Sequence, residues 1–278
     1  MLPNLKLPKF TYDNALVPLK NYCKENELTL LFASDCGSHA WGYASDTSDW
    51  DIKFLYMHDD PDKYLSLFEP MQHTSFKYKD VVEYAGYDVR KYLGLLLKGN
   101  ANTHEMVNSQ YFYASAGDTA RDLADFTHDV LSENLDKVLA HYTGLAGSTY
   151  NERIRNVGEV TLKKWIYVVR PLLCAQFIHD KQALPPLNFA ELLAWAPVPN
   201  DVRSLMTELL EDRRQGRDST NLDMKPVDDW ATERLNHWFQ YLKDLKENGI
   251  LQERLLTYPE NFDKVYREIL KGTFSFGE

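Results

Sequence analysis

The chain has few cysteines and no long hydrophobic runs. Its three cysteines, Cys23, Cys36 and Cys174, are odd in number and far apart in the sequence. This pattern argues against a disulfide framework and for a reducing compartment. No apolar stretch approaches the length that a transmembrane helix needs, and the first ten residues lack the apolar region of a signal peptide. We therefore expect a cytoplasmic protein that does not enter a membrane.

Positive charge is also scarce. The 278 residues include 31 Lys and Arg against 41 Asp and Glu, which gives a formal net charge of −10. Proteins that bind long stretches of nucleic acid use a basic surface, because phosphate contacts dominate their affinity. The charge balance therefore argues against extended duplex binding. It favours a compact partner, such as an RNA or tRNA end, a nucleotide, a small molecule or a protein hydroxyl.

The spacing of the apolar residues divides the chain into two parts. The first part mixes runs of β-branched and aromatic residues with helical patterns, whereas apolar residues recur at three- and four-residue spacing through most of the second. In the first part we predict strands over 28–35, 51–57 and 76–85 and helices over 13–26 and 89–98. The last helical pattern, residues 261–272, is expected to pack on the helices of the second part.

These patterns predict the α+β class. The 44% of hydrophobic residues suffice for a packed core in a chain of this length. We expect a small mixed sheet with flanking helices in a first domain, residues 1–115. A mostly helical bundle, residues 116–278, would follow as a second domain.

The polar residues of greatest chemical interest lie between the first two predicted strands. Gly37-Ser38 ends the first strand and opens a short predicted helix, whose free backbone N–H groups suit a phosphate. Asp49 follows eleven residues after Ser38, and Asp51 stands at the start of the next strand. Residues two apart on a strand face the same side. Paired carboxylates on one rigid face suit a divalent cation such as Mg²⁺ or Mn²⁺. Gly-Ser alone is an ordinary turn and Asp-x-Asp alone an exposed surface, but together they predict a nucleotide and metal site.

This arrangement resembles the signature of the DNA polymerase β-type nucleotidyltransferase superfamily. Residues 37–67 and 83–113 resemble a branch of predicted bacterial and phage nucleotidyltransferases that includes polymerase-like proteins associated with RNA repair. The strong match covers about residues 28–113, and a weaker one covers residues 162–193. The chain departs from the branch at His39, where Arg is more usual, and this departure puts one phosphate contact in doubt.

The resemblance implies a third acidic residue on the next strand. The candidate is Glu83, where related sequences tend to carry Asp, and it would bind a metal ion or act as general base. The alternative is an ordinary exposed glutamate on a strand. Asp88 stands in front of a helical pattern, so an N-cap role fits it better.

One predicted helix of the second part carries cations at helical spacing. Lys163, Tyr167 and Arg170 lie four and three residues apart and share a face. Helical second domains of similar enzymes bind the triphosphate or the acceptor, so Lys163 and Arg170 are candidates for that role. The alternatives are a solvated basic stripe, or Arg170 paired with an acidic neighbour inside the bundle.

The resemblance implies an enzyme that transfers a nucleoside monophosphate from a nucleoside triphosphate, with ATP as the expected donor, to an acceptor hydroxyl. Gly37 and Ser38 would hold the β- and γ-phosphates, and Asp49, Asp51 and Glu83 would bind Mg²⁺ while pyrophosphate is released. One alternative is a catalytically silent nucleotide-binding or regulatory protein of the same fold, which Glu83 and His39 favour. Another is an enzyme that differs only in its acceptor and modifies tRNA or protein.

Overall fold

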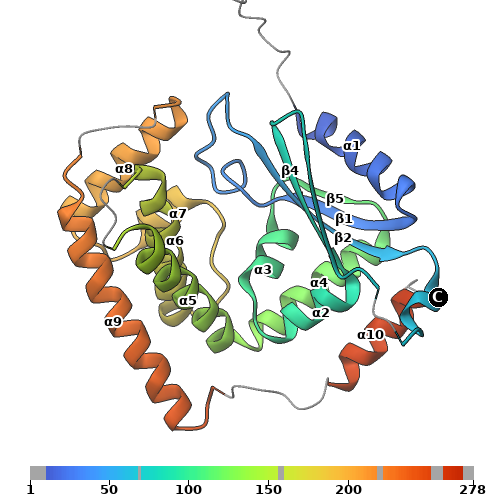
Figure 1. Ribbon diagram of the computed structural model, residues 1–278. Coiled ribbons are helices and arrows are strands. Elements are labelled where there is room, and N and C mark those ends of the chain that lie inside the picture. The colour runs from blue at the N-terminus through green and yellow to red at the C-terminus, as the bar shows by residue number, and fades with distance from the viewer. Residues whose placement is uncertain (1–10, 68–69, 156–159, 218–221, 252–258, 272–278) are drawn as a thin grey trace, which may run out of the picture.

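The computed structural model describes residues 11–67, 70–155, 160–217, 222–251 and 259–271. Its described strands form one five-stranded sheet in the order β3-β4-β2-β1-β5 (Figure 1). β2 and β4 are parallel neighbours, and the other pairs are antiparallel. The strands are β1 (Leu28–Asp35), β2 (Trp50–His58), β3 (His73–Tyr78), β4 (Val82–Asp88) and β5 (Phe112–Ala114).

One predicted strand is in fact a hairpin. The sequence pattern predicted a single strand over 76–85, but the chain reverses between β3 and β4 at Lys79 and Asp80. Both residues have positive φ angles, 52° and 54°, as the tight turns of β-hairpins require. Neither is glycine or asparagine, which is why the turn was not recognised. The short edge strand β5 was also not predicted.

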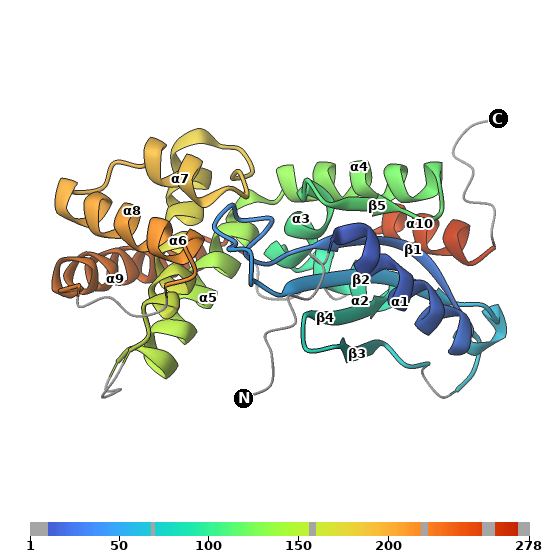
Figure 2. The ribbon, with the colours of Figure 1, turned by 90° about the horizontal axis from the view of Figure 1, so that it is seen from above.

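The sheet is covered by helices on both faces. α1 (Tyr12–Glu25) packs on one face, where Leu16 and Leu19 join a core with Ile52 and Phe54 of β2. Helices α2, α3 and α4 lie on the other face, beside Phe32 and Leu55 (Figures 1 and 2). Alternate strand residues therefore belong to two different cores, as the period of a strand dictates. These three helices are α2 (Val89–Leu97), α3 (Ala101–Asn108) and α4 (Asp118–Ser132).

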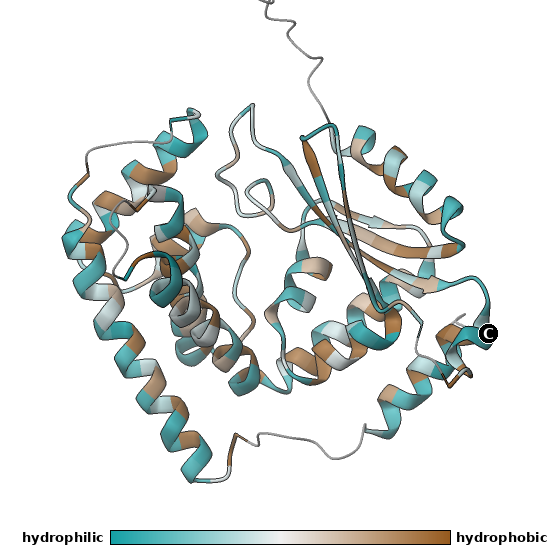
Figure 3. Ribbon diagram, viewed as in Figure 1, coloured by the Kyte–Doolittle hydropathy of each residue, from teal (hydrophilic) through white to brown (hydrophobic). Residues whose placement is uncertain are grey.

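The next helices along the chain form a bundle beside the sheet. Their buried apolar residues belong to one core cluster, and hydrophobic and hydrophilic residues alternate along their ribbons (Figure 3). α5 and α6 make the most extensive helix–helix contact of the chain. The bundle consists of α5 (Leu135–Arg153), α6 (Leu162–Lys181), α7 (Phe189–Trp195), α8 (Asn200–Arg214) and α9 (Lys225–Glu247). The predicted α+β class is confirmed.

The last helix does not pack on this bundle. α10 (Glu260–Leu270) contacts α2 on the sheet side, where Arg90 Nε and Nη2 donate to Tyr266 Oη at 3.0 and 2.8 Å. Phe262 also packs edge-on against Phe126 of α4. The expectation for residues 261–272 was therefore wrong, because helical spacing does not say which neighbour an apolar face will meet. The domain boundary between residues 115 and 116 stays a prediction.

No helix among the described residues is both long enough and apolar enough to cross a membrane.

Candidate active site

The segment after β1 forms a set of turns and not a helix. Trp41 N donates to Gly37 O at 3.0 Å, and Tyr43 N donates to Ser38 O at 3.1 Å. Gly42 then takes a φ of +80°, which ends any helical path. The prediction of a short helix was wrong, so no helix dipole supports a phosphate here. We call residues 37–43 the Gly-Ser turn, and phosphate binding by Gly37 and Ser38 stays a prediction.

Asp35, at the end of β1, ties this turn to the next strand. Its Oδ2 accepts from Gly37 N at 3.2 Å and from Ala40 N at 2.9 Å, and its Oδ1 accepts from Asp51 N at 3.0 Å. Burial raises the pKa of Asp35 to about 6, although the three backbone N–H groups oppose this rise. Asp35 was not among the residues predicted from the sequence. An acidic residue at the end of a buried strand, two positions before Gly37, was the signal.

The carboxylate of Asp51 lies directly against the Gly-Ser turn. A Cβ atom built on Gly37 would be 2.0 Å from Asp51 Oδ2, so only glycine leaves room for this side chain. The turn and the carboxylate that the sequence placed fourteen residues apart are therefore in contact. This contact is the central geometric feature of the site.

Replacing Gly37 is expected to disrupt this contact. In Gly37→Ala the new methyl group would overlap Asp51 Oδ2, so either the turn or the carboxylate must move. Overpacking of this kind costs about 1–3 kcal/mol of the free energy of unfolding. Chemical denaturation of wild type and variant measures the effect. Gly144→Ala is the control, because nothing lies within 4 Å of a Cβ there. Equal stability of wild type and Gly37→Ala would contradict the prediction.

Asp49 and Lys163 share the electrostatic environment of Asp51. Burial raises the pKa of Asp51 to about 6, the negative charges of Asp49 and Asp35 add to the rise, and the ammonium of Lys163 opposes it. Lys163 lies in the first turn of α6, and its charge and that of Asp49 both act on the carboxylate of Asp51. Binding of a triphosphate or of a metal ion by these residues stays a prediction.

The raised pKa of Asp51 predicts how stability changes with pH. Its ordinary value is 3.8 and its value in the fold is about 6. The stabilisation from the protonated carboxyl is complete below pH 4 and is lost as the pH rises through 6. Between pH 4 and pH 7, the free energy of unfolding of wild type should fall by about 1–2 kcal/mol relative to that of Asp51→Asn. This value allows for the partial exposure of Asp51 to solvent, which weakens the effect of its charge. Urea unfolding in buffer with a metal chelator measures this difference, and a pH-independent difference would contradict the prediction.

His39 lies beside the same carboxylates. Its ring stacks on Trp50 at 3.7 Å with an interplanar angle of 4°, and its Nε2 is 3.5 Å from Ser48 O. Burial lowers the pKa of His39, while the charges of Asp51 and Asp49 partly oppose the change. The side chain that replaces the usual Arg is thus neutral and packed at neutral pH.

Glu83 lies next to Asp51 but is engaged elsewhere. The parallel register of β2 and β4 pairs Asp51 with Glu83, so both face the same side of the sheet. The carboxylate of Glu83 forms an exposed ion pair with Lys77 across the β3–β4 hairpin. Among the described residues, no group of three or more His, Cys, Asp or Glu side chains could hold a metal ion. The expected three-carboxylate site is therefore not assembled, and Glu83 as third ligand stays a prediction. Asp88 caps α2 as expected, because its Oδ1 accepts from Arg90 N at 2.8 Å.

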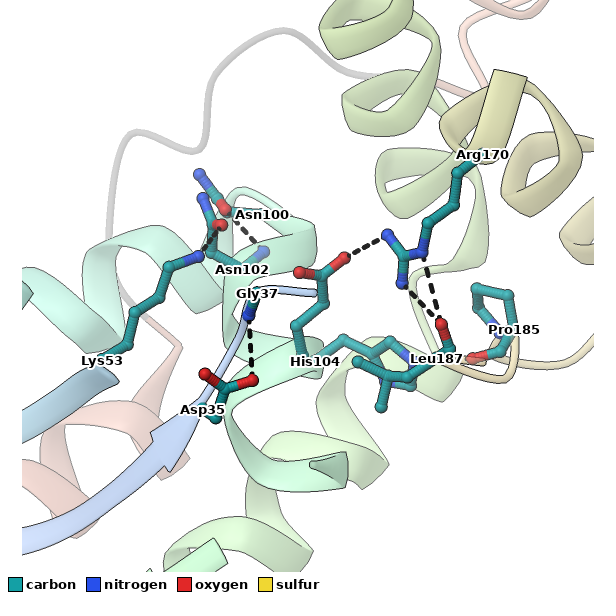
Figure 4. A network of polar contacts seen from close by, with 10 residues as sticks. Asp35, Gly37, Lys53, Asn100, Asn102, His104, Arg170, Pro185 and Leu187 are labelled. Atoms are coloured by element: carbon teal, nitrogen blue, oxygen red, sulfur yellow. Dashed lines mark hydrogen bonds and ion pairs between the residues drawn. The ribbon is translucent and has the colours of Figure 1, made fainter. Parts of the chain in front are cut away.

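Arg170 is buried in the junction between α6 and the sheet side. Its Nη1 donates to Glu105 Oε1 at 2.7 Å, and its Nε and Nη2 donate to Leu187 O at 3.3 Å (Figure 4). Its guanidinium also lies 4.2 Å from the ring centre of Trp41. Of the three roles open for Arg170, the structure shows the ion pair with an acidic neighbour, although that neighbour, Glu105, belongs to α3 and not to the bundle.

Lys53 is a second residue that the sequence analysis missed. It follows Asp51 by two positions on β2 and so shares its face. Its Nζ donates to Asn102 Oδ1 at 2.5 Å, at the start of α3 (Figure 4). A lysine among the apolar residues that follow Asp51 in β2 was the available signal.

Comparison with known proteins agrees with this geometry. Residues 13–257 match the model of a family described as the RNA repair pathway DNA polymerase beta family, RlaP. The chain belongs to this family. The RlaP match confirms the resemblance seen in the sequence and extends it across the bundle. It places the chain among nucleotidyltransferase-like proteins.

Two individual proteins are also similar to this RlaP-family chain. The uncharacterized protein YcgL of Bacillus subtilis (strain 168) is 28% identical over 202 residues, which cover 72% of this chain and 75% of YcgL. A crystal structure of a nucleotidyltransferase-like protein from Exiguobacterium sibiricum 255-15 aligns over 95% of this chain and 89% of its own. That alignment has 14% identity and a TM-score of 0.35.

Proposed function

We propose that the chain transfers a nucleoside monophosphate from a nucleoside triphosphate, with ATP as donor, to an acceptor hydroxyl. The observation that carries this proposal is the carboxylate of Asp51 seated on Gly37, with Asp49 and Lys163 acting on the same space. A tight turn beside paired carboxylates and a cation is the arrangement that a triphosphate requires.

The carboxylate pair suits a hard divalent cation. Oxygen ligands are those that Mg²⁺ and Mn²⁺ prefer. Burial and the nearby negative charges of Asp49 and Asp35 raise the pKa of Asp51, and a cation would relieve the repulsion between these charges. Asp49 and Asp51 would hold the ion, and Glu83 would join them only by leaving Lys77. When bound, the ion would neutralise charge on the phosphate oxygens.

Each residue then has a defined task in the transfer. Gly37 and Ser38 would hold the β- and γ-phosphates, and Lys163 would bind a phosphate oxygen. The acceptor oxygen attacks the α-phosphorus, its proton passes to Glu83, and the bond from the α-phosphorus to the bridging oxygen breaks to release pyrophosphate. An RNA or tRNA end is the acceptor that we propose, with a protein hydroxyl or a small molecule as the other classes.

One experiment tests both the donor and the acceptor. The purified protein is incubated with each of the four α-labelled nucleoside triphosphates, Mg²⁺ or Mn²⁺, and whole-cell extract. Samples treated with ribonuclease or protease are then separated on gels, and pyrophosphate is measured in parallel. We expect label in the ribonuclease-sensitive fraction. Label that only protease removes would reassign the acceptor, and no label with no pyrophosphate would refute the transfer.

The ion pair between Lys77 and Glu83 favours a second candidate function. A protein whose third carboxylate stays paired with a lysine could bind a nucleotide without turning it over. In that case calorimetry would detect ATP binding while no pyrophosphate is released. Lys77→Ala separates the two functions, since freeing Glu83 should raise the turnover of an enzyme and leave a silent binder inactive.

A further inference from the structure

The Gly-Ser turn is held by two different parts of the chain. On the sheet side, Asp35 accepts hydrogen bonds from Gly37 and Ala40. The far end of the turn, Trp41 and Gly42, contacts residues of the bundle that lie more than a hundred positions away in the sequence. The loop that carries the turn extends from the sheet towards α7 and α8 in both views (Figures 1 and 2).

Two consecutive carbonyl groups of the turn accept hydrogen bonds from the bundle. Phe189 N, at the start of α7, donates to Trp41 O at 3.0 Å. Arg214, at the end of α8, donates from both Nε and Nη2 to Gly42 O, at 3.0 and 2.9 Å. Two donors from one rigid guanidinium fix the direction of that carbonyl.

Packing reinforces these hydrogen bonds. Gly42 has a φ of +80°, and a Cβ atom there would be 2.6 Å from Asn188 Nδ2. Asn188 is itself fixed, because its Oδ1 accepts from Ala190 N at 2.9 Å as the N-cap of α7. The preceding loop is anchored through Pro185 O, which lies 2.8 Å from His104 Nε2, so Phe189 stands on a braced segment (Figure 4).

We propose that Arg214 is a positioning residue for the donor nucleotide, acting through the carbonyl of Gly42. This inference rests on the proposed function, since it assigns the Gly-Ser turn to the triphosphate. Arg214 orients Gly42 O. The hydrogen bonds from Trp41 N to Gly37 O and from Tyr43 N to Ser38 O transmit that orientation back to the start of the turn, where the phosphates would bind. Because Arg214 belongs to the bundle, the bundle helps to form the donor site.

Arg214 suits a test because its side chain lies at the surface, 41% exposed, and so its removal leaves the core intact. In Arg214→Gln we expect the dissociation constant for ATP with Mg²⁺ to rise about three- to tenfold, which corresponds to the loss of an exposed charged hydrogen bond. The KM for ATP should rise by the same factor while kcat and the KM for the acceptor stay unchanged. Arg214→Lys keeps one donor and should restore part of the affinity. Arg121→Gln, an exposed arginine paired within α4, is the matched control.

A measurement without nucleotide makes the test independent of activity. Hydrogen exchange of the peptide that contains the turn should be faster in Arg214→Gln than in wild type and unchanged in Arg121→Gln. The double variant Arg214→Gln with Gly42→Ala should show less than the sum of the two single effects on ATP binding, because both act through one contact.

The possible outcomes distinguish the positioning role of Arg214 from the proposed nucleotidyl transfer. If wild type binds ATP and Arg214→Gln binds it equally well, the positioning role is refuted while the proposed function stands. If wild type binds none of the four nucleoside triphosphates, the proposed function fails, and the role of Arg214 fails with it. Faster exchange together with weaker ATP binding supports the proposal.

Discussion

Asp51→Asn is expected to lower the rate of nucleotidyl transfer by about a thousandfold or more, which corresponds to several kcal/mol of lost transition-state stabilisation. The amide keeps the shape of the carboxylate and still fits against Gly37, but it removes the negative charge that would hold a divalent cation. Asp49→Asn should have a comparable effect. Pyrophosphate release under saturating ATP measures both.

The fold of the variant should survive, so the loss can be assigned to chemistry. Asp51 is partly buried among like charges, and its neutralisation removes repulsion from Asp49 and Asp35. Asp51→Asn should therefore be at least as stable as wild type at pH 8. Asp125→Asn, at an exposed position of α4, is the matched control for the substitution. Pyrophosphate release by Asp51→Asn at the wild-type rate would exclude this carboxylate from the mechanism.

The sequence was informative about Asp51 because strand periodicity is local. Apolar runs located β1 and β2, and Asp51 lies near the start of β2 as predicted, whereas Asp49 precedes that strand. The prediction that both carboxylates face one side stays a prediction. The parallel register that pairs Asp51 with Glu83 agrees with the expectation that the next acidic strand residue stands beside them. The sequence could not show that Lys77 would compete for Glu83, because the β3–β4 hairpin was predicted as one strand.

Contacts between residues that are far apart in the sequence account for most of the other differences between the predicted and the observed site. The role of Asp35 depends on three backbone N–H groups that donate to its carboxylate. These groups come together only when the turn packs against β2. Arg214 reaches Gly42 across 172 positions, and helical spacing says nothing about such a contact. The same spacing put Lys163 and Arg170 on one face, yet one acts on Asp51 and the other is buried. A shared helix face does not imply a shared environment when the helix crosses a junction.

The buried pair of Glu105 and Arg170 should give the largest effect on stability. The two side chains are 6% and 2% exposed and 2.7 Å apart, at the junction of α3 and α6. Burial alone would raise the pKa of Glu105, but the charges of Arg170 and Lys53 lower it, so the carboxylate is ionised inside the core. Arg170→Met leaves that charge without its partner and should cost about 3–5 kcal/mol of the free energy of unfolding.

A double variant distinguishes the pair from its individual members. Glu105→Leu together with Arg170→Met removes both charges and should be more stable than either single variant, since no unpaired charge stays buried. The double variant should still be less stable than wild type, because the contact of the Arg170 guanidinium with Trp41 is also lost. Arg121→Met, which breaks the exposed pair with Asp118, should cost less than about 1 kcal/mol. Urea unfolding measures all four variants. If the single and double variants lose equal stability, Glu105 and Arg170 are not energetically coupled, and α3 and α6 are held together by apolar packing alone.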